Sequence, residues 1–309
     1  MSRPYKPLTS ARLNDTILGC FAHVKPSETL DHLVRYLGTW SGSELLQVIQ
    51  YVLKLVVPFL ELRARLQHRA GLRAAPKSTS ADSYSKFSSF IGDSRTLWRI
   101  WGLLPIFQWL ISLERSPPAT RKLLTIERLQ GWSMLAYYPL EHLYYLGAHG
   151  IIPAAVTSPF SLFSAKKTKL SLNFNKIALW STRFWAAYVF LHFAHLVEDR
   201  KLLKLRHTSM RKAKASGLSV EEKEEMNQRW DAFWSEVVIN MGYLPLTIHW
   251  SMEGGLFRNE TWVAVFGLVA AVASFRTGWK ATALPRASPP AKKEVAETAE
   301  NVVAYDVTS

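Results

Sequence analysis

The stretch FSSFIGDSRTLWRIW, residues Phe87–Trp101, governs the interpretation of this chain because its apolar residues recur at helical spacing. On a helix that turns about 100° per residue, one set of side chains falls within an arc about 120° wide, as in a stripe that buries apolar surface. The set is Phe87, Phe90, Ile91, Ser94, Leu97, Trp98 and Trp101. Arg95 and Arg99 flank this stripe. Aromatic bulk beside arginines is typical of a helix lying in a lipid interface, although a helix packed on its own protein has the same pattern.

The amino-acid composition indicates which class of partner the protein binds. The 309 residues carry a formal charge of +14, from 38 Lys and Arg against 24 Asp and Glu. Such an excess favours nucleic acid or anionic lipid. Because 48% of residues are hydrophobic, with 12 Trp and 15 Phe, we expect an anionic phospholipid membrane and no nucleic acid. The single cysteine, Cys20, excludes zinc fingers and an intrachain disulfide, which suits a reducing compartment.

Helical periodicity dominates the chain, and strand signals are scarce. We therefore expect an all-α, membrane-associated protein with an amphipathic interfacial helix and one or two transmembrane helices. The predicted N-terminal helical region covers 1–69, with helices at 27–37 and 43–57, and the second of these is broken or kinked at Pro58. A linker (70–83), the amphipathic membrane-remodelling helix (84–113) and an aromatic helical region and loop (114–176) follow. The remaining divisions are a candidate transmembrane helix (177–197), a basic loop and helical segment (198–260), a second candidate transmembrane helix (261–279) and a disordered tail (280–309).

Two segments are candidates for crossing a bilayer. Ile177–Val197 contains one formal charge, Arg183, and its length suffices for a hydrocarbon core of about 30 Å; the alternative is a buried helix of a soluble bundle. Thr261–Phe275 is uncharged but short, and Trp279 extends it. Its Gly267 and Ala271 have the small-residue spacing that lets two helices approach closely in lipid. We interpret them as a self-association face that would support a homo-oligomer.

A run of basic residues without an acid follows the first candidate span. It comprises Arg200, Lys201, Lys204, Arg206, Arg211, Lys212 and Lys214. Ser219 and Glu222 then form a capping-box pattern, and the glutamates after Ser219 fit a solvated helix start better than a metal site.

No constellation indicates an enzyme. His192 and His195 share a helix face, but Glu198 is rotated about 240° from His192 at 100° per residue, which spoils a three-ligand site. His249 and Glu253 are four residues apart without a nucleophile motif. We expect no catalytic residues, no metal and no cofactor.

Three segments together carry a family resemblance. Leu33–Trp40, with Ile49–Tyr51 and Leu53–Leu55, resembles the N-terminal signature of the peroxin 11 family. Ser88–Arg99 is similar to that family's amphipathic helix, and the aromatic run Trp132–Tyr145, closed by Gly147, looks like the fungal branch. The resemblance spans residues 27–280 apart from loops.

The resemblance implies a peroxisomal membrane protein that elongates the membrane before division. It also implies self-association, recruitment of fission machinery including a dynamin-related GTPase, and delivery by the peroxisomal membrane-protein import receptor. That receptor reads basic-plus-apolar segments, and Arg200–Lys214 fits the description. One departure is that the family's amphipathic helix is more densely basic than this one, whose headgroup candidates are Lys86, Arg95 and Arg99.

The predicted mechanism is insertion of one helix face into one leaflet, which expands that leaflet and curves the bilayer. The predicted inserting residues are Phe87, Phe90, Ile91, Leu97, Trp98 and Trp101. Half-immersion of these side chains is worth on the order of 5–9 kcal/mol before ordering costs, against about 1 kcal/mol per basic residue. Two alternatives remain open. One is a pore or metabolite channel whose lumen is lined by Arg183, His192 and His195. The other is a fission adaptor that does not itself remodel the membrane.

Overall fold

The computed structural model describes residues 14, 18–19, 42–157, 169–213 and 219–281. The predicted helix at 27–37 lies outside the described residues, as does the predicted disordered tail beyond residue 281. The expected all-α fold is confirmed, and the exception is a small hairpin. In this hairpin β1 (Ala155–Thr157) pairs antiparallel with β2 (Lys169–Ser171), with Val156 opposite Leu170.

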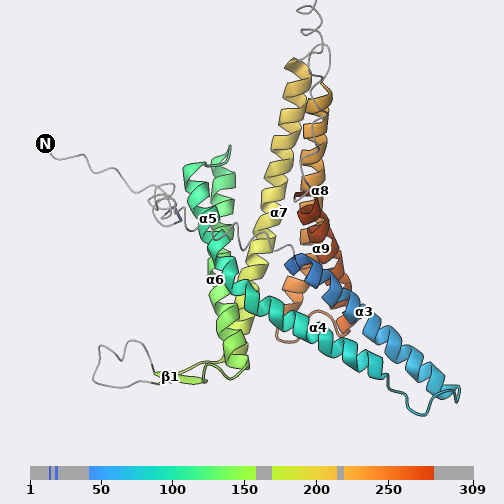
Figure 1. Ribbon diagram of the computed structural model, residues 1–309. Coiled ribbons are helices and arrows are strands. Elements are labelled where there is room, and N and C mark those ends of the chain that lie inside the picture. The colour runs from blue at the N-terminus through green and yellow to red at the C-terminus, as the bar shows by residue number, and fades with distance from the viewer. Residues whose placement is uncertain (1–13, 15–17, 20–41, 158–168, 214–218, 282–309) are drawn as a thin grey trace, which may run out of the picture.

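Long helices form the body of the protein. They are α3 (Gly42–Arg69), α4 (Thr79–Trp98), α5 (Leu103–Arg115), α6 (Arg121–Ala148), α7 (Phe174–Ala213), α8 (Val220–Trp250) and α9 (Glu260–Ala281), with a short 3-10 helix, η2 (Arg99–Gly102), between α4 and α5. In Figure 1, α6, α7 and α8 stand upright, whereas α3 and α4 lie side by side and project away from them. The contacts of α9 with both α3 and α8 join the projecting pair to the upright helices.

The amphipathic segment is longer than predicted and is interrupted. α4 begins at Thr79 because the Ser78 side chain accepts a hydrogen bond from the Ala81 N–H, so the linker is shorter than 70–83. The helix tightens at Arg99–Gly102 before α5 continues to Arg115. Pro105 lacks an N–H and leaves the Trp101 carbonyl without its usual helical partner, which is consistent with the interruption there. The predicted helix at 84–113 is therefore two helices joined by a 3-10 turn.

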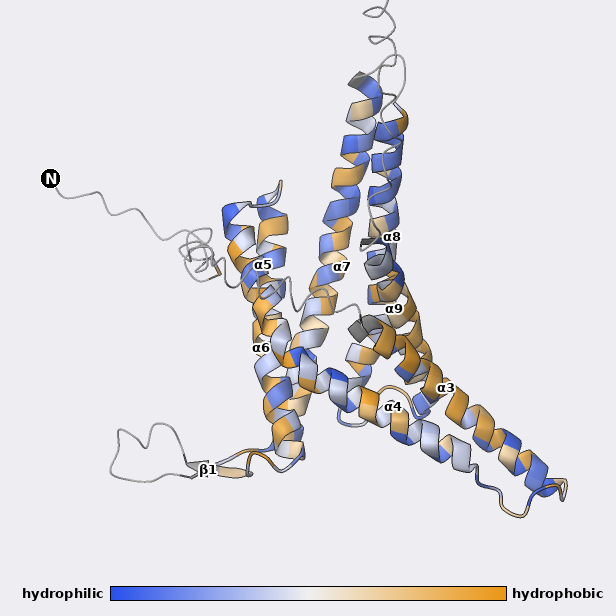
Figure 2. Ribbon diagram, in the orientation of Figure 1, coloured by the Kyte–Doolittle hydropathy of each residue, from blue (hydrophilic) through white to orange (hydrophobic). Residues whose placement is uncertain are grey.

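Two helices of the described chain are long and apolar enough to cross a membrane: Leu45–Arg69 in α3 and Glu260–Lys280 in α9. Figure 2 shows both helices as strongly hydrophobic, in contrast to the polar C-terminal end of α7 and N-terminal end of α8. α3 continues through Pro58 to Arg69, so that proline does not end it. The predicted span Ile177–Val197 is not one of the two. It lies inside the 40-residue α7, where Ala186, Val189 and Leu196 are buried in the protein.

The small residues of α9 pack within the chain. A Cβ atom at Gly267 would lie 2.3 Å from the Tyr51 ring, and Ala271 is buried in the cluster that Tyr51 of α3 forms with Ala264. On α8, a Cβ at Gly242 would lie 2.8 Å from the backbone nitrogen of Ala270. α3 of the same chain thus packs on the predicted self-association face at Gly267 and Ala271.

Candidate functional site

The outer face of α4 and η2 exposes large apolar side chains. Phe90 is 69% exposed, Phe87 53% and Leu97 50%. We define the outer face as Tyr84, Phe87, Phe90, Leu97, Trp98, Ile100 and Trp101, all of which are exposed. The stripe predicted from periodicity is thus present on the surface, with one exception. Ile91 is only 5% exposed, because it lies at the edge of the stripe and turns inward.

The opposite, inner face of α4 is fixed to the protein by polar contacts. The Ser88 hydroxyl donates to the Gln50 carbonyl at 3.2 Å, and Arg95 donates to the side-chain oxygens of Gln50 (2.6 Å) and Gln47 (2.8 Å). Arg95 and Arg99 therefore lie against the protein and do not flank the outer face. Of the three predicted headgroup residues, only Lys86 is exposed to solvent.

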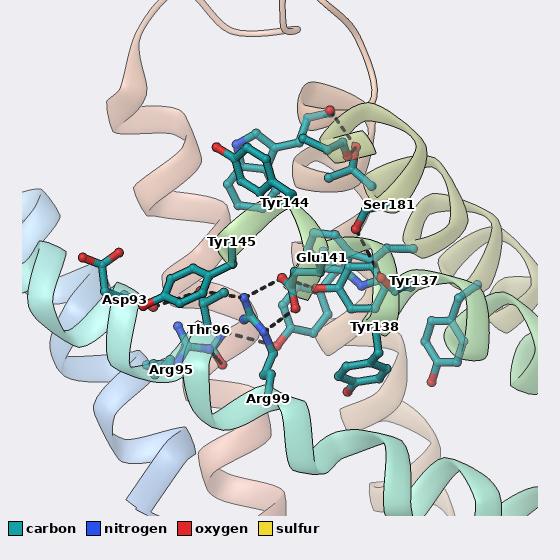
Figure 3. Close-up of a pocket in the computed structure, with 18 of the residues that line it drawn as sticks. Asp93, Arg95, Thr96, Arg99, Tyr137, Tyr138, Glu141, Tyr144, Tyr145 and Ser181 are labelled. Carbon is teal, nitrogen blue, oxygen red and sulfur yellow. Dashed lines mark hydrogen bonds and ion pairs between the residues drawn. The ribbon is translucent and has the colours of Figure 1, made fainter. Parts of the chain in front are cut away.

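Arg99 marks where the inner face meets α6. Its guanidinium donates to both carboxylate oxygens of Glu141, at 2.6 and 3.0 Å, and the Tyr137 hydroxyl donates to the same carboxylate at 2.6 Å. Figure 3 shows these three side chains converging at one wall of a cavity. Burial raises the pKa of Tyr137, which keeps its hydroxyl protonated as the donor in this contact. The network holds the C-terminal end of α4 against α6.

The cavity beside this network has a volume of about 660 Å³. Its walls come from α3, α4, α6, α7 and α8, and tyrosines such as Tyr138, Tyr145 and Tyr243 form much of them. A groove of about 700 Å³ between α3 and α4 adjoins it, because both are lined by Gln50, Lys54, Gly92 and Asp93. Sequence reasoning missed this cavity, since its lining residues are spread from Gln47 to Trp250.

The two histidines of α7 that the sequence singled out, His192 and His195, are half-buried and do not line that cavity. His192 contacts Glu236 at 3.3 Å and Gln130 at 3.0 Å, and His195 lies 3.8 Å from Glu127. The described residues contain no cluster of ligands suited to a metal ion. His249 does not pair with Glu253: its Nδ1 accepts backbone N–H groups of the following loop, 2.8 Å from the nitrogen of residue 256.

The residues assigned to a pore lumen do not line the cavity. Arg183 donates to the Ser251 carbonyl at 3.3 Å and lies over the Trp180 ring. His192 and His195 are likewise absent from the lining.

The predicted basic loop is helical, because α7 continues to Ala213. Its basic side chains from Arg200 to Lys212 are exposed, although Lys201 pairs with Glu198 and Arg206 with Glu225. Lys214 lies outside the described residues. The capping box at Ser219 and Glu222 is confirmed at the start of α8.

Comparison with known proteins gives two findings. Residues 30–279 match the protein family described as "Peroxisomal biogenesis factor 11 (PEX11)". The chain is also similar to an uncharacterized protein of Schizosaccharomyces pombe, at 24% identity over 198 residues, which cover 64% of this chain and 77% of that protein. No solved structure matches the chain.

Proposed function

This chain belongs to the peroxisomal biogenesis factor 11 family, and from that premise we propose that it elongates the peroxisomal membrane by inserting the outer face of α4 and η2. Family membership gives a peroxisomal protein with a role in peroxisome proliferation and division, in a family of biogenesis factors and not of known enzymes. The insertion mechanism is our proposal. The observation that supports it best is a row of exposed Phe, Leu and Trp side chains on one face of a helix whose other face is fixed to the protein.

The free energy of insertion comes mainly from apolar burial. Half-immersion of the five predicted residues that are exposed is worth roughly 4–8 kcal/mol before ordering costs. These residues are Phe87, Phe90, Leu97, Trp98 and Trp101. Ile91 is left out of this free energy because it is buried in the protein. Headgroup contacts of Arg95 and Arg99 are left out because both side chains contact the protein. Electrostatic attraction to anionic lipid must then come from Lys86 and from basic residues elsewhere in the chain.

The inner face makes α4 a rigid wedge. Arg95 ties the middle of the helix to α3, and Arg99 ties its end to α6. A helix held in this way cannot roll to hide its apolar side chains. Because α9 is long and apolar enough to cross a membrane, we infer that it anchors the protein with the wedge beside it. α3 lies side by side with α4 and therefore shares the orientation of the wedge.

Self-association and recruitment complete the proposal. Since α3 covers Gly267, we propose that copies meet through the exposed face of α9 that carries Trp262, Val269 and Val272. The exposed basic residues of α7 are our proposed contact for the import receptor. We propose the fission machinery, including a dynamin-related GTPase, as a partner on family grounds.

The test is tubulation of vesicles and elongation of peroxisomes by the double variant Phe90→Asp with Leu97→Asp. We expect purified wild-type protein to tubulate vesicles containing anionic phospholipid and the double variant to lose this activity, while its targeting to peroxisomes persists. Ser89→Asp is the matched control, because it places a carboxylate on the same helix without removing an apolar side chain. Tubules of normal length with the double variant would rule out insertion by this face.

A further inference from the structure

One guanidinium that lines the interior cavity, that of Arg95, contacts no carboxylate of the described residues. Arg95 donates to the side-chain oxygens of Gln50 and Gln47, and both acceptors are neutral amides. In the part of the chain that the structure describes, no carboxylate forms an ion pair with Arg95 and none is among the groups that shift its pKa. Burial and the neighbouring Arg99 guanidinium both lower that pKa, but an arginine stays charged in proteins. Arg95 is therefore a partly buried positive charge without a counter-ion.

The same side chain has an unused donor. The Arg95 Nε atom is buried and has no hydrogen-bond partner. A buried donor without a partner costs about 1–3 kcal/mol, and such donors are usually satisfied by water or a ligand. A guanidinium has five N–H donors in a fork that matches the oxygens of phosphate, and two of them contact the amides of Gln47 and Gln50.

Besides Arg95, the charged residues that line the cavity are Lys54, Arg99, Asp93, Glu141 and Glu236. Arg99 is paired with Glu141, and Glu236 lies 3.3 Å from His192. Lys54 and Asp93, one of each sign, lie where the cavity adjoins the groove. Arg95 differs from Arg99 because no carboxylate within the described chain contacts its guanidinium, so its Nε remains available to donate to an incoming anion.

The cavity also has the size and the lining of a ligand site. Its volume of about 660 Å³ lies within the usual range for small-molecule sites, roughly 300–1,000 Å³. Tyr138, Tyr145 and Tyr188 supply rings and hydroxyl groups to its walls, and the groove between α3 and α4 provides a route inward. We propose that this cavity binds a phosphate ester, with the phosphate on Arg95 and the organic part among the tyrosines.

Two sources share this chemistry: the headgroup of a phospholipid that enters along α3, and a soluble phosphate ester. The inference does not depend on membrane insertion, because Arg95 lies on the face of α4 opposite Phe90. Its failure and the failure of the wedge proposal are therefore separable.

The test uses full-length protein in an uncharged detergent. Binding of dihexanoyl phosphatidic acid, glycerol 3-phosphate and phosphate-free dihexanoylglycerol would be measured by calorimetry and by tryptophan fluorescence, since Trp185 and Trp250 line the cavity. We expect saturable binding of at least one phosphate probe and weaker binding of dihexanoylglycerol. Arg95→Gln should weaken phosphate binding at least tenfold. Lys223→Gln, which removes an exposed charge from α8 at a position outside the cavity lining, should leave it unchanged.

The outcomes separate the sources and decide the proposal. Binding of glycerol 3-phosphate supports a soluble ester, and binding of phosphatidic acid alone supports a lipid headgroup. The proposal is overturned if neither phosphate probe binds saturably, if dihexanoylglycerol binds equally well, or if folded Arg95→Gln binds like the wild type. If Arg95→Gln does not fold, the wild-type comparison still decides, together with Arg95→Lys, which keeps the charge and should retain part of the affinity.

Discussion

Buried arginines hold the helices of this protein together, and Arg128 is the most enclosed of those described here. Its guanidinium donates through Nε and Nη2 to the two carboxylate oxygens of Glu114, each at 2.6 Å, and the side chains are 4% and 6% exposed. Arg128→Ala would leave Glu114 buried without its partner, which typically costs roughly 3–5 kcal/mol. We expect that loss in the free energy of unfolding, followed by circular dichroism in detergent.

The control for this prediction is Arg65→Ala on α3. The Arg65–Glu61 pair is exposed on both sides, and such pairs contribute at most about 1 kcal/mol. Equal losses for the two variants would contradict the assignment of Arg128 to a structural ion pair.

The half-buried, stacked histidines His192 and His195 on α7 make stability depend on pH. Burial, then the nearby His192, lowers the pKa of His195 below its usual 6.5, against weaker opposing effects of Asp199 and Glu236. The unfolded chain therefore binds a proton more readily than the folded one, so His195 contributes stability above pH 6.5 that is lost as the pH falls below it. Burial raises the pKa of Glu127, so at lower pH the folded chain binds this proton more readily than the unfolded chain. Glu127 therefore adds stability as the pH falls, which opposes the effect of His195.

We expect the melting temperature to fall between pH 7 and pH 6, and this slope to flatten in His195→Gln. Thermal unfolding at constant ionic strength measures this slope, and His207→Gln, on the same helix, is the control. An unchanged slope in His195→Gln would assign the pH dependence to another group.

At the scale of single residues, periodicity predicts which side chains of α4 are exposed but not what its arginines contact. The spacing of Phe87, Phe90 and Leu97 is a local property, and the sequence contains it in full. The partners of Arg95 and Arg99 lie more than 40 residues away in the chain, at Gln47, Gln50 and Glu141. No pattern within the helix can identify them.

At the scale of elements, the sequence indicates helices well and their roles less well. The Ser219 capping box is a local signal, and α8 begins where it predicts. Ile177–Val197 is apolar enough to suggest a span, but one side of it, with Ala186, Val189 and Leu196, packs inside a bundle with α6 and α8. Pro58 and the arginines after it hide the apolar character of α3, which is the better candidate. Composition alone does not show whether neighbouring protein or lipid surrounds a helix.

The contact between α8 and α9 depends on the absence of a side chain at Gly242. A Cβ there would lie 2.8 Å from the Ala270 nitrogen and 2.9 Å from the Phe266 carbonyl oxygen, and backbone atoms cannot rotate away. We expect Gly242→Ala to destabilise the protein by about 1–3 kcal/mol, measured by thermal unfolding. Gly254→Ala, in a loop with open space around it, should have little effect. Similar melting curves for Gly242→Ala and the wild type would show that the helices are less closely packed than described.

At the scale of the whole molecule, α3 connects three features. It is one of the two candidate spans, it packs on α9 through Tyr51, and it holds α4 through Gln47 and Gln50. The outer face of α4, the interior cavity and the candidate span α9 are therefore adjacent through α3.

This arrangement predicts different effects for two positions on α9. Gly267 lies under the Tyr51 ring of the same chain, so Gly267→Ala should lower the free energy of unfolding by about 1–3 kcal/mol. It should leave the oligomeric state unchanged, because α3 and not a second copy occupies that face.

Val272 lies on the exposed face of α9, so Val272→Ala should leave stability nearly unchanged and weaken the self-association that we propose for the exposed face. Light scattering in detergent, at matched protein concentrations, gives the oligomeric state, and thermal unfolding gives the stability. A Gly267→Ala protein with normal stability and lost self-association would place the contact between copies at Gly267, as the small-residue spacing alone suggests.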